Sequence, residues 1–199
     1  GPRFAELSAR TSVDYTGIGH LKRAVLRACF GRFELRAADE PLVAEFDRFV
    51  LSGGATLHQF ALFEAIAALH PRVPWHEWPR SLREPDAPGI ADFADAHAHL
   101  VRFALYQQWL ADRQLAAAAC HARERGLALG FFRDLAVGAA PDGAEVWANP
   151  SAVARGVAIG APPDPFSMAG QNWNLPPPNP EALLASACGG FGDLVAANM

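Results

Sequence analysis

The chain has 199 residues, of which 51% are hydrophobic and 19% are charged, a balance typical of globular proteins. Its formal net charge of −4 provides no basic field for binding nucleic acid. No apolar run approaches the roughly 20 residues of a membrane span, and the first residues lack a signal-peptide pattern. We therefore expect a cytoplasmic protein of one large or two small domains, with neither nucleic acid nor a membrane as partner.

The three cysteines, Cys29, Cys120 and Cys188, are widely spaced and form no C-x-x-C pair. This odd count and spacing argue against a disulfide framework and against a thiolate zinc site. Cys29 and Cys120 lie in apolar helical runs, which predicts buried, reduced thiols. The seven histidines show no metal-ligand spacing, so we expect no metal site.

Helical periodicity dominates the first two-thirds of the chain. Apolar residues recur at helical spacing over residues 18–30, 42–51 and 57–66, and again in a long stretch after Gly89 that ends at Arg125. Glycines at 31, 53, 54 and 126 follow three of these runs as stop signals. The Pro-rich segment between residues 71 and 88 holds Trp75 and Trp78, which we expect to anchor it onto the helices.

The pattern changes at Leu127, where a short apolar run extends to Phe132. It is too short for a further helix and predicts a buried strand, one helix-to-strand step of a parallel sheet or barrel. Asp134 would then lie at the carboxyl end of this strand, where such folds carry their chemistry. Its carboxylate could bind substrate hydroxyls, or it could form a structural salt bridge with a nearby arginine. Residues 157–160 predict a second strand.

Two further acidic residues, Asp142 and Glu145, follow in the segment that ends at Trp147. Pro-Asp-Gly is typical of a turn, and Asp142 could also cap a short helix. A structural role is favoured for both.

The segment from Ala161 to Pro180 is rich in proline, glycine, asparagine and aromatic residues. Its candidate substrate-binding residues are Asp164, Phe166, Ser167, Gln171 and Trp173. Aromatic faces pack against the apolar face of a sugar ring, whereas amides, hydroxyls and carboxylates bind its hydroxyls. From these residues alone, a carbohydrate site and a proline-rich surface loop are equally compatible with the pattern.

Three ordered blocks resemble the 4-alpha-glucanotransferase (amylomaltase) family. The loop follows that family's pattern G-x-P-P-D-x-F-S-x-x-G-Q-x-W-G-x-P from Gly160 to Pro176, with Asn174 in place of the glycine that follows the tryptophan. The segments 133–147 and 106–114 resemble the family's strand-end block and the helix before it. If position 174 requires positive φ, asparagine is the most tolerable substitute for glycine, so the loop should survive.

The resemblance implies an α/β fold: a mostly helical insertion region plus part of a (β/α)₈ TIM-type barrel. Residues 1–125 would be the barrel-inserted helices, and residues 126–199 would hold partial barrel strands and the substrate loop. The substrate would be an α-1,4-glucan or maltooligosaccharide, transferred by a retaining double displacement without a metal or organic cofactor. Asp134 would have a supporting role, because the nucleophile and the acid/base are expected beyond Met199.

The sequence also leaves two other functions open. The chain could be a non-catalytic glucan-binding or scaffold module that kept the sugar loop. Alternatively, Pro176–Pro180 could be a polyproline ligand for a partner protein, although these prolines continue the sugar-loop pattern.

Overall fold

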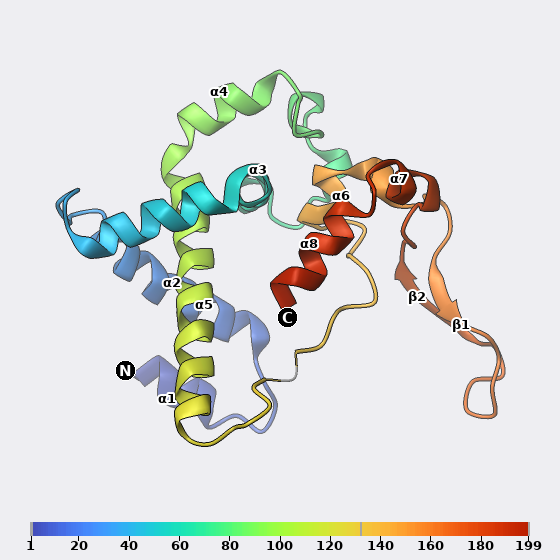
Figure 1. The fold of residues 1–199 in the computed structure, drawn as a ribbon, viewed down its shortest axis with the longest axis horizontal. Coiled ribbons are helices and arrows are strands. Elements are labelled where there is room, and N and C mark those ends of the chain that lie inside the picture. Colours follow the sequence, from blue (N-terminus) through green and yellow to red (C-terminus); the bar gives the residue numbers. More distant parts are fainter. Residues whose placement is uncertain (1, 132, 199) are drawn as a thin grey trace.

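The computed structural model describes residues 2–131 and 133–198, which are mostly helical (Figure 1). The elements in chain order are α1 (Pro2–Ser8), α2 (Tyr15–Phe33), α3 (Pro41–Leu69), the 3₁₀ turns η1 (Trp75–Glu77) and η2 (Arg80–Leu82), α4 (Gly89–Ala96), α5 (Ala98–Glu124), α6 (Ala144–Ala148), η3 (Pro150–Ala152), β1 (Ile159–Ala161), β2 (Gln171–Leu175), α7 (Pro180–Ala185) and α8 (Gly189–Asn198). Long helices build the first two-thirds of the molecule, and a hairpin projects from the last third.

Helix α2 begins after Asp14, whose carboxylate accepts a hydrogen bond from the Gly17 N–H at 2.8 Å. This cap satisfies one of the unpaired donors of the first turn. The predicted stop at Gly31 is wrong, since the helix continues to Phe33. A glycine inside a helix costs only about 1 kcal/mol, and the buried Phe33 ring packs against Phe46 with ring centroids 5.3 Å apart.

The two helices predicted over residues 42–51 and 57–66 are confirmed as the two halves of α3. Gly54 separates them, with φ 54° and ψ −147° inside an otherwise helical run. Such a conformation is readily adopted only by glycine. Both halves contribute to the core, because Phe46 of the first half and Ile66 of the second are fully buried.

The long helix predicted after Gly89 is divided into α4 and α5 at His97, which has φ −122° and ψ 28°. The predicted end of α5 is confirmed. Gly126 has φ 89°, and its N–H bonds to the Arg123 carbonyl while the Leu127 N–H bonds to the Ala122 carbonyl. This pair of bonds is the Schellman arrangement that ends many helices at a glycine.

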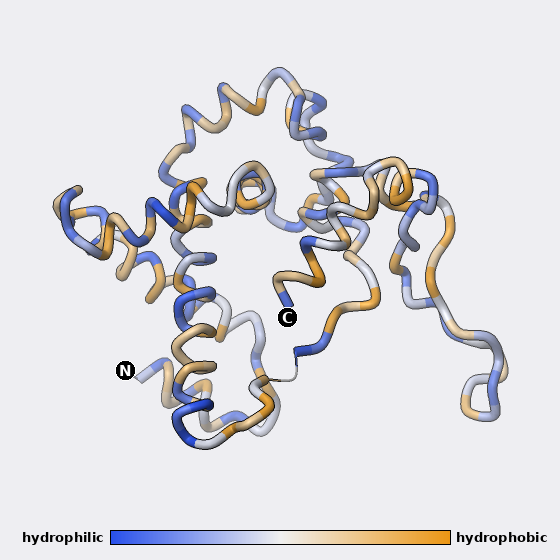
Figure 2. Tube along the Cα trace, viewed as in Figure 1, coloured by the Kyte–Doolittle hydropathy of each residue, from blue (hydrophilic) through white to orange (hydrophobic). Residues whose placement is uncertain are grey.

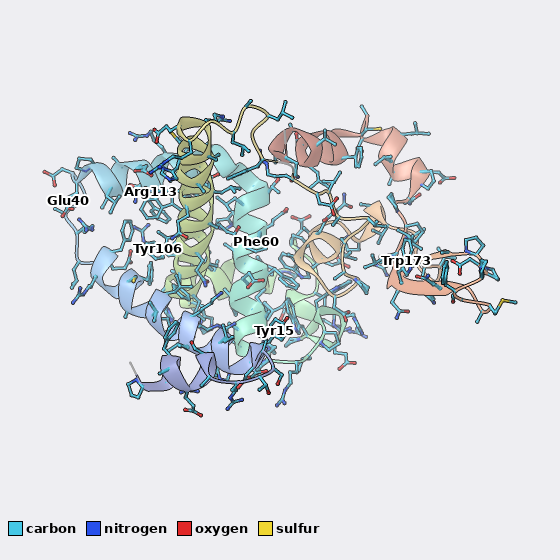
Figure 3. The ribbon with its side chains drawn as sticks, turned by 90° about the horizontal axis from the view of Figure 1, so that it is seen from below. Tyr15, Glu40, Phe60, Tyr106, Arg113 and Trp173 are labelled. Atoms are coloured by element: carbon cyan, nitrogen blue, oxygen red, sulfur yellow. The ribbon has the colours of Figure 1, made fainter. Side chains whose placement is uncertain are left out.

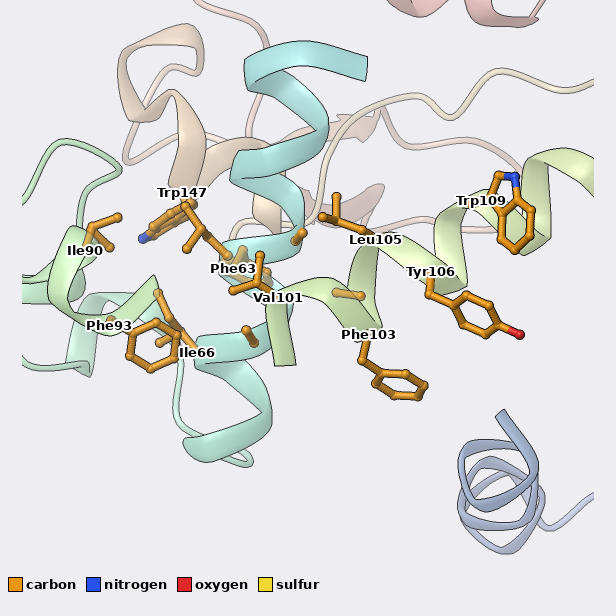
Figure 4. Packing of buried hydrophobic residues seen from close by; sticks show 14 of the residues in the cluster. Phe63, Ile66, Ile90, Phe93, Val101, Phe103, Leu105, Tyr106, Trp109 and Trp147 are labelled. Carbon is orange, nitrogen blue, oxygen red and sulfur yellow. The ribbon is translucent and has the colours of Figure 1, made fainter. Parts of the chain in front are cut away.

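The core lies where α3 crosses α5, and α2, α4 and α6 add side chains to it (Figures 1 and 4). One group of rings surrounds Trp109, whose centroid lies 5.4 Å from that of Phe33 and 5.6 Å from that of Phe46. A second group joins Phe63, Trp78 and Trp147. Each buried aromatic side chain contributes about 1.5–3 kcal/mol relative to an exposed one, so these rings are the main stabilising element.

Ion pairs border the first ring group. The Arg102 Nε lies 2.8 Å from a Glu34 carboxylate oxygen, and its guanidinium covers the Phe46 ring at 4.9 Å from the centroid. Arg113 pairs with Glu45 in the same way at 3.0 Å. Partly exposed pairs of this kind contribute about 0–1 kcal/mol each, so they supplement the apolar packing that holds the helices together.

The strand predicted over residues 127–132 is wrong for residues 127–131, and Phe132 lies outside the described residues. Gly130 has φ 75°, and its N–H turns back to the Leu127 carbonyl, which is incompatible with an extended strand. A strand requires a hydrogen-bonding neighbour, and the only two strands in the described residues pair with each other. Leu129 is fully exposed as a result.

The second predicted strand, over residues 157–160, is confirmed in part, because β1 covers Ile159–Ala161. It belongs to an antiparallel hairpin with β2, whereas a parallel sheet was expected. At the end of the hairpin away from its tip, the Ala154 N–H bonds to the Pro177 carbonyl and the Asn179 N–H bonds to the Ala152 carbonyl, which extends the pairing beyond the strands. The hairpin base is thereby fixed to η3 and to the start of α7.

The prediction that Cys29 and Cys120 are buried is also wrong, because both are exposed, as is Cys188. In the described structure Phe33 is the buried residue of α2, and the buried residues of α5 end at Trp109, so neither thiol lies in the packed part of its helix. Among the described helices, none is long and apolar enough to cross a membrane.

Candidate functional site

The predicted substrate-binding residues gather on the β1–β2 hairpin, which projects away from the helices (Figures 1 and 3). Ala161 pairs with Gln171 and Gly160 pairs with Asn172, whereas Ile159 pairs with Leu175. Two residues of β2, Trp173 and Asn174, are therefore extra relative to β1. Such a bulge bends a strand and redirects the side chains it carries.

Two glycines allow the hairpin to close. A Cβ atom on Gly160 would lie 2.0 Å from the Gln171 carbonyl oxygen, so no larger residue fits without moving the strands. Gly170 has φ 72°, and a Cβ there would lie 2.7 Å from the Ala161 carbonyl oxygen. Both positions therefore require glycine because the two strands approach closely.

Asp164 and Ser167 shape the tip of the hairpin. The Asp164 Oδ1 accepts the backbone N–H of Phe166 at 2.8 Å and that of Ser167 at 2.7 Å. The Ser167 hydroxyl donates to the Gly170 carbonyl at 2.8 Å. Side-chain bonds of this type replace backbone bonds in tight turns, so both residues have a structural role in addition to any contact with substrate.

The tip carries apolar side chains into solvent. Phe166 is 98% exposed and Met168 is 82% exposed. An aromatic side chain held almost entirely in water on a hydrogen-bonded turn gains nothing from burial within this chain. It is available for contact with a ligand or another part of a larger protein.

Trp173 lies on the bulge, and its ring is 43% exposed. Its indole N–H donates to the Gln171 Oε1 at 2.9 Å. Asn174 has φ 55°, and its N–H donates to the Asn172 Oδ1 at 2.8 Å. Position 174 thus has positive φ, the condition under which asparagine was expected to be the most tolerable substitute for glycine.

Asp134 is exposed in an irregular segment and is not at a strand end in the described residues. Its neighbour Arg133 donates to the Ala197 carbonyl at 3.2 Å. The same segment reaches the hairpin base at Gly138, where an added Cβ would lie 3.5 Å from Ile159 and 3.8 Å from Leu175. Asp134 therefore lies four residues before the point where its segment contacts the hairpin base, whereas the substrate-loop residues lie between that base and the tip.

The other candidates have structural roles. Trp78 is buried against Phe63 of α3, with ring centroids 5.2 Å apart, and Trp75 packs against the same core, which confirms that both anchor the Pro-rich segment onto the helices. Asp142 does not cap α6; it lies 3.5 Å from the His76 ring nitrogen. Trp147, in the same segment, is fully buried, and its indole bonds to the Leu82 carbonyl. The described residues contain no group of three potential metal ligands.

An open depression lies at the α3 kink, away from the hairpin residues. It is lined mainly by small and apolar side chains, with His58, Gln59 and Asp86 as its polar members. None of the predicted substrate-binding residues contributes to it. The hairpin residues are therefore an exposed surface and are separate from this depression.

The hairpin sequence and the helical arrangement both match known proteins. The family model described as 4-alpha-glucanotransferase matches residues 3–199. The chain belongs to the 4-alpha-glucanotransferase family. The family resemblance that the three sequence blocks indicated is thereby confirmed.

Curated relatives carry the same family name. A 4-alpha-glucanotransferase from Mycobacterium tuberculosis (strain ATCC 25618 / H37Rv) is 45% identical over 144 residues, which are 72% of this chain and 20% of that protein. One from Haemophilus influenzae is 31% identical over 207 residues, covering 99% of this chain and 30% of that protein. This member of the 4-alpha-glucanotransferase family thus spans less than a third of these two relatives.

Two solved amylomaltases share the fold. The chain superposes on the Corynebacterium glutamicum enzyme with a TM-score of 0.70 and 32% identity, covering 92% of this chain and 23% of that one. The Streptococcus agalactiae enzyme, solved in complex with acarbose, gives a TM-score of 0.73 at 23% identity, covering 87% of this chain and 35% of that one. The helices and hairpin are thus arranged as in part of an amylomaltase of the 4-alpha-glucanotransferase family.

Proposed function

We propose that this chain is a segment of a 4-alpha-glucanotransferase, an enzyme that transfers α-1,4-glucan segments between maltooligosaccharides. The observation that carries the proposal is the family match from residue 3 to residue 199, which includes the whole hairpin. The hairpin offers an exposed indole, an exposed phenyl ring, and amide and carboxylate groups on one short loop. This combination is suited to the mixed apolar and hydroxylated surface of a glucan.

In this proposal, Trp173 and Phe166 pack against sugar rings, and Asp164, Ser167 and Gln171 bind hydroxyls or hold the loop that does so. Asp134 has a supporting role near the reacting sugar. The structural similarity to an amylomaltase solved with acarbose supports an oligosaccharide ligand. Residues 1–125 would be helices inserted in a (β/α)₈ barrel, and residues 126–199 would hold part of that barrel and its substrate loop.

The reaction would be a retaining double displacement. A carboxylate from another part of the protein attacks the anomeric carbon, and a second, protonated carboxyl group donates its proton to the departing glycosidic oxygen and becomes a carboxylate. The hydroxyl of an acceptor glucan then attacks the glycosyl-enzyme, and the second carboxylate takes up its proton. This restores the nucleophilic carboxylate and the protonated acid and forms one α-1,4 bond for each bond broken.

The test is disproportionation of maltotriose by the full-length protein that carries this chain. We expect glucose to accumulate together with maltooligosaccharides longer than maltotriose. Glucose without longer products would indicate hydrolysis in place of transfer. Binding of maltooligosaccharides without any change in their length would instead support a non-catalytic glucan-binding module.

Asp134→Ala provides a test of the supporting residue, with Asp142→Ala as its control. Both side chains are exposed, so neither change should alter the fold. We expect Asp134→Ala to lower kcat at least tenfold, because a carboxylate near the reacting sugar stabilises its positive transition state. Asp142→Ala should retain wild-type kinetics, and equal kinetics for the two variants would remove Asp134 from the site.

A further inference from the structure

We propose that Gln171 is a positioning residue that fixes the Trp173 indole before substrate arrives. This inference rests on the proposed glucan-binding role of the hairpin. It assigns contact with the sugar to Trp173 and orientation of the indole to Gln171. Gln171 would act on the sugar chiefly through Trp173, with its side-chain oxygen committed to the indole.

The hydrogen bond itself determines which amide atom is used. An indole N–H can only donate, so the partner 2.9 Å away must be the carbonyl oxygen Oε1 of Gln171. The amide nitrogen of Gln171 then faces away from that bond. The two residues are two positions apart on β2, a spacing that places side chains on the same side of a strand.

Trp173 is partly exposed, and no other aromatic side chain of the described residues fixes the orientation of its ring. Trp75, Trp78, Trp109 and Trp147 each lie near another aromatic or histidine ring. Among the described residues, no aromatic ring lies at stacking distance from Trp173, and its side chain remains 43% exposed. An exposed indole on a bulge would sample several rotamers unless a hydrogen bond selected one.

The backbone of the bulge contributes the second half of the arrangement. The Asn172 Oδ1 accepts the Asn174 N–H at 2.8 Å, and Asn174 keeps φ 55°. These two features bracket Trp173 and set the direction of its Cα–Cβ bond. The Gln171 bond then sets the orientation of the ring, so a flat apolar face is presented at the cost of little conformational entropy on binding.

The experiment separates the oxygen of Gln171 from its amide nitrogen. Gln171→Glu retains an acceptor and removes the donor, Gln171→Met removes both, and Trp173→Phe removes the indole N–H while keeping an aromatic face. The full-length protein is assayed with maltotriose, and the KM and kcat are compared for each single variant and for Gln171→Met/Trp173→Phe.

We expect Gln171→Met to raise the KM roughly five- to tenfold, as the loss of one hydrogen bond would. The KM of Gln171→Glu should be at least threefold lower than that of Gln171→Met. The double variant should be no worse than its more affected single variant, because both changes remove the same interaction. The proposal would be overturned if the KM increase in the double variant equalled the product of the two single increases. It would also be overturned by equal KM values for Gln171→Glu and Gln171→Met, which would make the amide nitrogen the sugar-binding group.

The indole resonance offers a readout that does not depend on activity. In nitrogen-15 spectra, the Trp173 Nε1–H signal should move in Gln171→Met and remain hydrogen-bonded in Gln171→Glu. An unmoved signal in both variants would also overturn the proposal. Trp173→Ala with wild-type KM would instead reject the glucan-binding role of the hairpin, so the failures of the two proposals can be told apart.

Discussion

At the scale of single residues, Asp164 has two separate reasons to be present. The family pattern makes it a candidate sugar-binding carboxylate, while its Oδ1 accepts two backbone N–H groups of the hairpin tip. Both roles require an acceptor oxygen at this position. The turn can use the neutral oxygen of an amide as well as that of a carboxylate, whereas a sugar-binding role of the carboxylate depends on its charge. Substitutions at this site can therefore distinguish the two roles.

Asp164→Asn keeps the acceptor oxygen and removes the charge, whereas Asp164→Ala removes both. If the turn is the main role, Asp164→Ala should destabilise the hairpin tip by about 1 kcal/mol, as for the loss of other capping bonds. Asp164→Asn should be close to wild type. Hydrogen exchange of the Phe166 and Ser167 amides measures this directly. Slow exchange in Asp164→Ala would show that these bonds do not hold the turn.

Some of this local chemistry could be predicted from the sequence. The sequence suggested that asparagine could replace a family glycine at position 174 if that position had positive φ, and it does have φ 55°. The sequence did not reveal the bond between Gln171 and Trp173. That bond depends on the bulge, which arises from the register of two strands and not from any local pattern. A polar residue two positions before an exposed tryptophan is too common a signal to predict it.

At the scale of elements, the end of α5 and the α3 kink were predictable, whereas the end of α2 and the strand expected after Leu127 were not. Gly54 and Gly126 have conformations that glycine favours, so their effects are local. Residues 127–131 have the composition of a buried strand, but a strand exists only with a partner. Within the described residues that partner is absent, and the segment turns at Gly130.

Helix α3 also carries a carboxylate whose ionisation opposes folding. Partial burial raises the pKa of Glu64 above its usual value of 4.5, and the nearby positive charge of Arg23 offsets only part of the effect. A raised pKa means that the folded state binds the proton more tightly than the unfolded state. Stability is therefore lost as the pH rises through the folded-state pKa.

Glu64→Gln should consequently stabilise the protein at pH 7 and have little effect at pH 4.5. The gain should stay below about 1 kcal/mol, because the side chain is partly exposed and solvent screens its charge. Urea unfolding at the two pH values measures it, with the exposed Glu77→Gln as control. A larger gain at pH 4.5 than at pH 7 would contradict the sign of this pKa shift.

At the scale of the whole molecule, a packed helical core is joined to segments with little burial. The ring groups around Trp109 and Trp147 lie among the helices, whereas Leu129 is fully exposed and Leu127 and Phe131 are nearly half exposed. Figure 2 shows hydrophobic stretches along this connection and in the C-terminal helices. Such surface is typical of a region that contacts another part of a protein or a second copy.

The isolated chain should therefore self-associate as its concentration rises. Leu129→Asp should shift the equilibrium toward the monomer by placing a charge in the middle of this apolar segment. Leu35→Asp, at a single exposed leucine beyond α2, serves as the control and should have little effect. Size-exclusion chromatography over a hundredfold range of concentration tests this. A compact wild-type monomer throughout would refute it.

The central claim is that the hairpin carries the glucan, and Trp173 is the side chain on which it depends most. The direct measurement is the KM for maltotriose of Trp173→Ala in the full-length protein, compared with Phe4→Ala, an exposed aromatic on α1. We predict at least a tenfold higher KM for Trp173→Ala, because a stacked aromatic contributes about 0.5–1.5 kcal/mol in addition to the apolar area that it buries. Its thermal stability should be unchanged, and Phe4→Ala should behave as wild type. A wild-type KM for Trp173→Ala would contradict the account.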